Sequence, residues 1–129
     1  MAWELPIMKL PGIAAGADLS AQQFRGVKLT AANTVGAIAA DTDAVLGVLQ
    51  NNPTAGQTAE VMTVGVTRMA ASAAIAVGAP VGVAADGRAV TRALGTDTTK
   101  HVIGTALEAA AAAGDIIAVY INIVPNRAS

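Results

Sequence analysis

Short runs of apolar and β-branched residues recur along the chain at intervals of roughly ten residues, with turn residues between them. The clearest runs lie at residues 60–67 and 116–124. Asp86-Gly87 joins two shorter runs and is a strong signal for a tight hairpin. This pattern predicts an all-β fold, a small β-sandwich or barrel with only minor helix.

One stretch of the chain occurs twice. Residues 45–67 recur as residues 102–124, so that Gly47 coincides with Gly104 at a separation of 57 positions. The same separation aligns alternate residues of the strand that follows: Met62 with Val119, Val64 with Ile121 and Val66 with Ile123. A glycine inside a β-branched strand usually marks a bulge or a close backbone approach, so Gly47 and Gly104 are predicted to be structural glycines.

The beginning of the chain differs from the rest. Two prolines exclude a continuous helix there, so residues 1–17 are predicted to form an extended arm. A single β domain, residues 18–129, is expected to follow, built from two related halves of about residues 18–67 and 68–129. The large side chains of the arm are apolar and unsuited to a solvated tail: Trp3, Leu5, Ile7, Met8, Leu10 and Ile13. We expect the arm to be buried on another chain, with its own domain as the alternative, because an isolated domain offers it no obvious place.

Two short segments carry weak helix signals. Residues 18–25 contain a Ser20-x-x-Gln23 capping box, which allows one or two helical turns. Residues 108–113 are rich in alanine, but so short a run is not stable as an isolated helix. We expect at most one helical turn at the second place.

The composition predicts an unusual core. Hydrophobic residues make up 53% of the chain but aromatic residues only 2%, so each buried side chain removes little apolar area from water. Only 13% of the residues are charged, which is low for a soluble monomer. We therefore expect an oligomer, in which further apolar surface is buried between subunits.

The sequence does not support several classes of partner and location. The net charge is −1 and no basic stripe carries interleaved aromatic residues, so nucleic acid is a poor partner. No apolar run approaches the roughly 18 residues that would cross a membrane, and the first residues do not resemble a signal peptide. Cysteine is absent, which excludes disulfides and thiolate chemistry and fits a reducing cytoplasm.

Side chains that could carry chemistry are scattered. His101 is the single histidine and lies beside Lys100 at the start of a predicted strand, where we expect a surface role. Asp41-Thr42-Asp43 resembles the beginning of a calcium loop but lacks the glycine and the distant glutamate of that motif, which favours a solvated turn. The sequence contains no nucleophile elbow, phosphate-binding glycine loop or zinc ligand set. We expect no enzymatic activity, no metal and no cofactor.

Four segments, taken in order, resemble one protein family. They are FRGVKL from residue 24, GVLQNNPTAGQTAEVMTVGV from residue 47, AAIAVGAPVGVAADGRAV from residue 73 and VIGTALEAAAAAGDIIAVYI from residue 102. Together, over residues 18–123, they resemble the small capsid decoration (cement) proteins of tailed bacteriophages. Phe24 stands where the family usually has a tyrosine, and His101 stands where an aromatic residue is expected. These departures concern local packing.

The resemblance implies a β-tulip-like or small-barrel domain, often trimeric, on the surface of the virion. Such proteins bind the outside of an expanded capsid and bridge neighbouring major capsid protein subunits. The implied partners are thus the major capsid protein and further copies of the chain, as a homotrimer. In such relatives the N-terminal arm often joins the capsid contact, which makes these the candidate contact residues: Trp3, Leu5, Ile7, Met8 and Leu10. Two alternatives stay open, a β-clip-like ligand-binding or accessory domain of an enzyme, and another virion component such as a tail or neck subunit.

Overall fold

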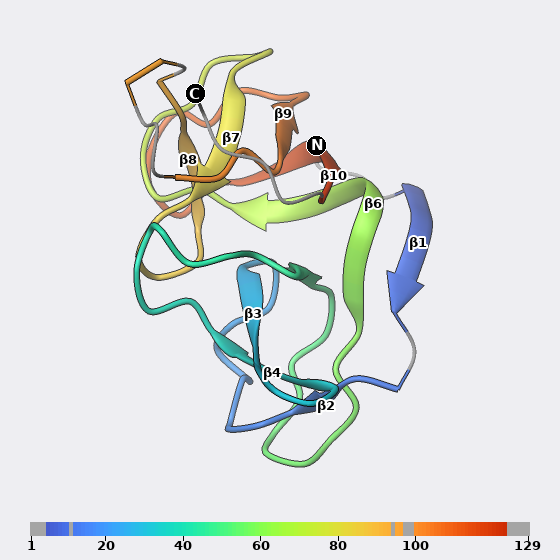
Figure 1. The fold of residues 1–129 in the computed structure, drawn as a ribbon. Coiled ribbons are helices and arrows are strands. Elements are labelled where there is room, and N and C mark those ends of the chain that lie inside the picture. The colour runs from blue at the N-terminus through green and yellow to red at the C-terminus, as the bar shows by residue number, and fades with distance from the viewer. Residues whose placement is uncertain (1–4, 11, 94, 97–99, 124–129) are drawn as a thin grey trace.

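The computed structural model describes residues 5–10, 12–93, 95–96 and 100–123, which form an all-β fold (Figure 1). Ten strands belong to one mixed hydrogen-bonded sheet. Their bounds are β1 Leu5–Leu10, β2 Ala14–Ala15, β3 Gly26–Ala31, β4 Thr34–Ala37, β5 Gly47–Leu49, β6 Val61–Ala70, β7 Pro80–Val83, β8 Ala89–Thr91, β9 Gly104–Ala106 and β10 Ile116–Asn122. The predicted all-β class is confirmed. The hydrogen bonds of the described strands do not divide them into the two separate sheets of a sandwich.

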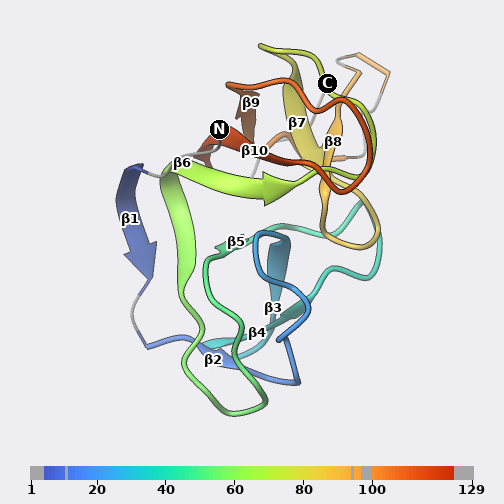
Figure 2. The ribbon, with the colours of Figure 1, turned by 180° about the vertical axis from the view of Figure 1, so that it is seen from behind.

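The same strand order occurs twice along this sheet. The first half pairs its strands in the order β4-β3-β5-β6, and the second half in the order β8-β7-β9-β10. All pairs within these quartets are antiparallel, and the quartets meet where β6 pairs with β10. Figures 1 and 2 show the first quartet below and the second above, with β6 reaching from one to the other.

Equivalent hydrogen bonds connect equivalent positions of the two quartets. The Glu60 N–H donates to Asn51 Oδ1 at 3.0 Å, and the Ala118 N–H donates to Glu108 Oε1 at 2.8 Å. Asn51 and Glu108 are 57 positions apart, whereas Glu60 and Ala118 are 58 apart. The spacing from Glu108 to Ala118 is therefore one residue longer than the spacing from Asn51 to Glu60.

Because of this extra residue, β6 and β10 match at a separation of one position more than the sequence repeat predicts. Leu49 of β5 pairs with Val61 of β6. At the equivalent place in the second half, Ala106 of β9 pairs with Val119 of β10. Val119 thus corresponds to Val61, and the predicted match with Met62 is wrong by one residue. Because side chains alternate between faces, this slip exchanges the two faces of the strand.

Strand β6 belongs to both quartets. It pairs with β5 over Val61 and Met62, and with β10 over residues 64–70. Gly65 lies where these two regions meet and has a φ of 133°, a conformation that residues with a Cβ rarely adopt. In Figure 1 the strand turns sharply between its two parts. A glycine inside a strand often marks such a bend, and here the bend allows one strand to serve both halves.

Residues 5–10 of the predicted arm lie on their own domain. They form β1, which pairs antiparallel with β6 over residues 61–66, with two register shifts in the ladder. The expectation that an isolated domain offers the arm no place is therefore wrong for these residues, because β6 presents an edge that β5 and β10 leave open. Beyond this strand, β2 pairs parallel with β4, and Ile13 and Ala15 are buried in the core.

The expected minor helix does not occur in the described residues. Within residues 18–25, the Phe24 N–H donates to the distant Leu49 carbonyl at 2.8 Å instead of to Ser20, as it would in a helix. In the alanine run, Ala110 and Ile75 exchange two main-chain hydrogen bonds of 2.9 Å. Main-chain groups that a helix would need are thus engaged with other segments, and tertiary pairing overrides local propensity in both places.

Buried apolar residues gather in two clusters, largely one for each half. The first-half cluster consists of Ile13, Ala15, Leu19, Val27, Val35, Leu49, Ala59 and Val61. The second-half cluster lies mainly among β7 to β10 and the second part of β6. It also takes in Ile38, Val48 and Met62 from the first half. The two halves therefore share part of one core.

Gly47 and Gly104 lie where a side chain has no room. A Cβ on Gly47 would lie 2.5 Å from the Met62 carbonyl oxygen, and a Cβ on Gly104 would collide with the Tyr120 carbonyl oxygen. We predict that Gly47→Val and Gly104→Val each lower the free energy of unfolding by about 1–3 kcal/mol, because the neighbouring backbone must move. Urea unfolding measures this loss. Thr105→Val, at an exposed position of β9, is the control and should change the free energy by less than about 0.5 kcal/mol. Unchanged stability of both glycine variants would contradict these close approaches.

Candidate interaction surface

The described residues contain no cluster of possible metal ligands. No three His, Cys, Asp or Glu side chains in this part of the chain come together as a possible metal site. The described ranges also hold no helix long and apolar enough to cross a membrane. The main surface feature is an apolar hollow between the two halves.

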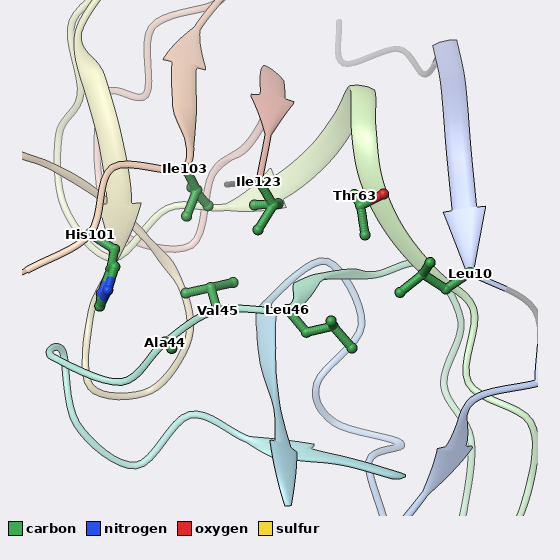
Figure 3. A pocket seen from close by; sticks show the side chains of 8 residues that line it. All are labelled: Leu10, Ala44, Val45, Leu46, Thr63, His101, Ile103 and Ile123. Carbon is green, nitrogen blue, oxygen red and sulfur yellow. The ribbon is translucent and has the colours of Figure 1, made fainter. Parts of the chain in front are cut away.

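The hollow has a volume of about 400 Å³ (Figure 3). In Figure 3 the side chains of Ile103 and Ile123 face those of Val45 and Leu46 across a common opening. The lining residues are Leu10, Ala44, Val45, Leu46, Thr63, His101, Ile103 and Ile123. His101, for which the sequence favoured a surface role, is half-buried in this wall. Apart from Thr63 and His101, the lining is aliphatic.

The hollow lies where the two core clusters meet. Val45 and Ile123 pack against the second-half cluster, whereas Leu10 and Leu46 pack against the first-half cluster. Leu46 and Ile103 directly precede β5 and β9, and so occupy equivalent positions of the two halves. The same position in each half thus contributes an aliphatic side chain to one opening.

A smaller hollow of about 200 Å³ shares a wall with the first. Ala44, Val45 and Leu46 line both hollows, and Leu29 of β3 lines only the smaller one. Leu29 is 53% exposed, so part of this aliphatic surface is in contact with water. We call the lining residues of the two hollows together the apolar groove.

The buried side chain of Arg92 forms hydrogen bonds that stabilise one wall of the apolar groove. Arg92 is 4% exposed, and its guanidinium donates to the main-chain carbonyl oxygens of Val83, His101 and Asp41. Asp41 belongs to the first half, whereas Val83 and His101 belong to the second. Lys100 adds an ion pair with Asp41 at 3.0 Å. Arg92 therefore joins the two halves at the groove.

One carboxylate organises the turn that leads into the apolar groove. Asp43 Oδ2 accepts hydrogen bonds from Lys28 Nζ at 2.9 Å and from the N–H groups of Ala39 and Ala40. The Lys28 ammonium above all, followed by the two N–H groups, lowers the pKa of Asp43 from 3.8 to about 2. Asp43 thus serves as the cap of a turn, the interpretation that the sequence favoured over a calcium loop.

A second apolar surface lies on the outer face of β10. Ile116 and Tyr120 are 43% and 41% exposed, and Leu107 is 38% exposed. The Leu107 N–H donates to the Ala118 carbonyl, which places Leu107 beside these two residues. Neighbouring residues of a strand point to opposite faces, so Tyr120 points away from Ile121 in the core. We call Leu107, Ile116 and Tyr120 the outer face.

The candidate contact residues from the sequence are placed only in part. Trp3 lies outside the described residues, Leu5, Ile7 and Met8 belong to β1, and Leu10 lines the apolar groove. Sequence reasoning missed the groove residues of segment 44–46. A signal was available, because apolar residues precede the repeated glycines at the same place in both halves.

Comparisons with known proteins bear on both family and fold. The sequence pattern of a family described as "Phage cement protein" matches residues 12–121, which confirms the resemblance seen in the sequence. The structure is similar to the crystal structure of head fiber gp8.5 N base in bacteriophage phi29. The TM-score is 0.65 and the sequence identity 20%, over 89% of this chain and 95% of that chain. At this identity the likeness shows the fold alone. No curated protein matches the chain.

Arg92 should contribute strongly to stability. We predict that Arg92→Met lowers the free energy of unfolding by roughly 2–3 kcal/mol, because three buried carbonyl groups lose their donor. Arg88→Met is the matched control, since Arg88 pairs with the exposed Asp86 and should cost less than about 1 kcal/mol. Chemical denaturation of both variants measures the difference. Equal losses would show that Arg92 does not tie the halves together.

Asp43 should make stability depend on pH in acid. Its pKa in the folded protein lies below the reference value of 3.8, so its contribution is present above that value and is lost as the pH falls toward about 2. We predict that the urea midpoint of the wild type falls between about pH 5 and about pH 2. The urea midpoint of Asp43→Asn should be lower than that of the wild type at pH 5 and should fall less as the pH is lowered, because the variant lacks this contribution at every pH. The same fall in both proteins would contradict the assigned role.

Proposed function

The chain belongs to the phage cement protein family, and from this membership we propose that it stabilises the phage head by bridging neighbouring major capsid protein subunits. As a member of this structural family it is a non-enzymatic protein of the capsid surface of the virion. The alternative of an accessory domain of an enzyme is therefore set aside.

One observation supports the bridging proposal above the others: the aliphatic residues of the apolar groove are not fully covered by the chain itself. Leu29 is half exposed, and Leu10, Val45, Leu46 and Ile123 are only partly buried. Apolar surface that remains in contact with water favours a partner that would cover it. A capsid surface is the partner that the family supplies.

We propose that the arm takes part in the same contact. β1 pairs with β6 alone among the described strands, so the other edge of β1 offers main-chain groups to which an extended segment can add. The candidate contact residues of the arm are Trp3, Leu5, Ile7, Met8 and Leu10. Of these, Leu10 also lines the apolar groove, so arm and groove form one continuous surface.

We propose a homotrimer as the assembled form. The outer face leaves Ile116 and Tyr120 exposed on a central strand, and it lies on the side of β10 opposite the core. The family resemblance favours three copies. Each small aliphatic side chain of the core contributes little hydrophobic free energy when it is buried within one chain. Burial of further apolar surface between copies would therefore add stability.

We further propose that the halves derive from one repeated unit and close into a β-tulip-like or small-barrel form. Support comes from the shared strand order and from two isolated bridges. Ala71, directly after β6, bridges to Ala89 of β8, and Ala14 of β2 bridges to Thr58, shortly before β6. In the first half β2, which extends the sheet beyond β4, thus returns toward the start of β6, and in the second half β8 returns toward the end of β6.

A second candidate function is the base of a head fibre, one form of the alternative in which the chain is another virion component. It is favoured by the likeness to the head fiber gp8.5 N base, which extends over nearly the whole of both chains. A fibre base would also attach to the head, but it would carry a further protein on its distal side. If phage particles carry this protein but have no head fibres, the cement role is favoured over the role as a fibre base.

Loss of Trp3 should weaken binding to the capsid. We predict that Trp3→Ala, and removal of residues 1–4, reduce binding to expanded capsids by at least about tenfold, because a large apolar anchor is lost. Removal of residues 1–4 leaves β1 intact, whereas removal of residues 1–17 would also take away β1 and the buried residues Ile13 and Ala15. Co-sedimentation with capsids across a range of protein concentrations measures the affinity.

Val77→Ala is the control for this experiment. Val77 is 67% exposed and apolar but belongs neither to the arm nor to the groove. It should bind as the wild type does. Full affinity of both arm variants would place the binding surface elsewhere on the domain.

Self-association should depend on the outer face. We predict that Tyr120→Glu shifts the isolated protein toward the monomer at micromolar concentration, because a charge would be buried between copies. Light scattering of wild type and variant measures the molecular mass, and Ala55→Glu, at an exposed position between β5 and β6, serves as the control. A wild type that is monomeric at all concentrations would restrict the trimer to the capsid surface.

A further inference from the structure

We propose that the apolar groove takes an extended, uncharged and aliphatic segment of the major capsid protein. This inference rests on the proposed function and deepens it, because it names the site and the chemistry of the contact. Four features of the groove support it: its shape, its aliphatic lining, the neutrality of its surroundings and its continuity with the arm.

The shape of the groove suits a strand more than a single compact group. Two hollows of about 400 and about 200 Å³ lie on either side of segment 44–46 and share its residues as a common wall. Alternate side chains of an extended segment point to the same side at a spacing of roughly 7 Å. Two aliphatic side chains of one strand can therefore enter the two hollows while its main chain crosses segment 44–46.

The larger hollow presents mainly aliphatic side chains. Thr63 Oγ1 and His101 Nδ1 are both buried from solvent, so neither atom is presented to an occupant of the hollow. The other six lining residues are aliphatic. An aliphatic side chain therefore fits this hollow better than a polar one.

The charges around the groove are already paired. Asp41 forms an ion pair with Lys100 at 3.0 Å, and Asp43 forms one with Lys28 at 2.9 Å. A charged segment entering between them would lose hydration without gaining an opposite charge. The occupant is therefore uncharged where it crosses the groove.

The groove is continuous with the surface proposed for the capsid contact. Leu10 is the last residue of β1 and also a wall residue of the larger hollow. The outer face, in contrast, lies on the opposite side of β10 and stays available for further copies of the chain. This division assigns the groove to the capsid protein and the outer face to self-association.

Photochemical cross-linking tests the occupant directly. A photoreactive benzoylphenylalanine replaces Leu29, a large and 53% exposed side chain at the smaller hollow, in the full chain, and the protein is bound to expanded capsids before illumination. We expect a cross-link to an uncharged aliphatic segment of the major capsid protein, identified by mass spectrometry. A cross-link to a second copy of the chain, or to its own residues 124–129, overturns the proposal. So does the lack of any cross-link on fully decorated capsids.

One substitution tests the shape. Ala44→Trp fills the groove and should weaken capsid binding by at least about tenfold, whereas Ala55→Trp, at an exposed alanine outside the groove, should not.

These variants separate the groove proposal from the proposed function. If wild type and Ala44→Trp bind capsids equally, the groove is not the contact, while the cement role stands. If the wild type itself fails to bind capsids, the proposed function falls and the groove proposal falls with it.

Discussion

Strand β6 hydrogen-bonds to β5 near its start, to β10 along its second part and to β1 on its opposite edge. These pairings require the strand to change direction, and Gly65 supplies the positive φ at which it does so. β5 and β10 pair with successive parts of the same edge of β6, so this one strand ends the first quartet and adjoins the second. The two quartets therefore meet along β6.

The core that surrounds β6 is built mainly from small aliphatic side chains, and this affects what else must hold the fold together. Small residues allow strands to approach closely, as Gly47 and Gly104 do, but each contributes little hydrophobic free energy. Hydrogen bonds and ion pairs therefore contribute a larger fraction of the stability of this fold than they would in a domain rich in aromatic residues. Arg92 joins main-chain carbonyl groups of both halves, and Asp43 holds the turn between β4 and β5.

Much of the architecture could be predicted from local patterns. The hairpin at Asp86-Gly87 forms as expected, with a φ of 85° at Gly87. The repeat indicated the paired strands but set the second pair one residue out of register, because an extra residue lies in a connection where no alternation constrains the alignment. The bend at Gly65 could not be foreseen, since glycine inside an apolar strand has the same local pattern whether the strand is straight or bent.

Long-range pairing explains the remaining differences from the sequence-based expectations. Ala110 pairs with Ile75 instead of joining a helix, and residues 5–10 add to β6 instead of extending away. The apolar groove was missed for a related reason: its residues come from six separate segments, and only the fold brings them together.

We propose that the apolar groove and β1 lie on the side of the protein that faces the shell. The outer face then makes the contacts between copies of the chain. A cryo-electron microscopy reconstruction of the decorated head tests this assignment most directly. We predict that the groove faces the capsid and that density for a capsid protein segment lies between segment 44–46 and the side chains of Ile103 and Ile123. A groove that faces solvent, with the outer face against the shell, would contradict the account.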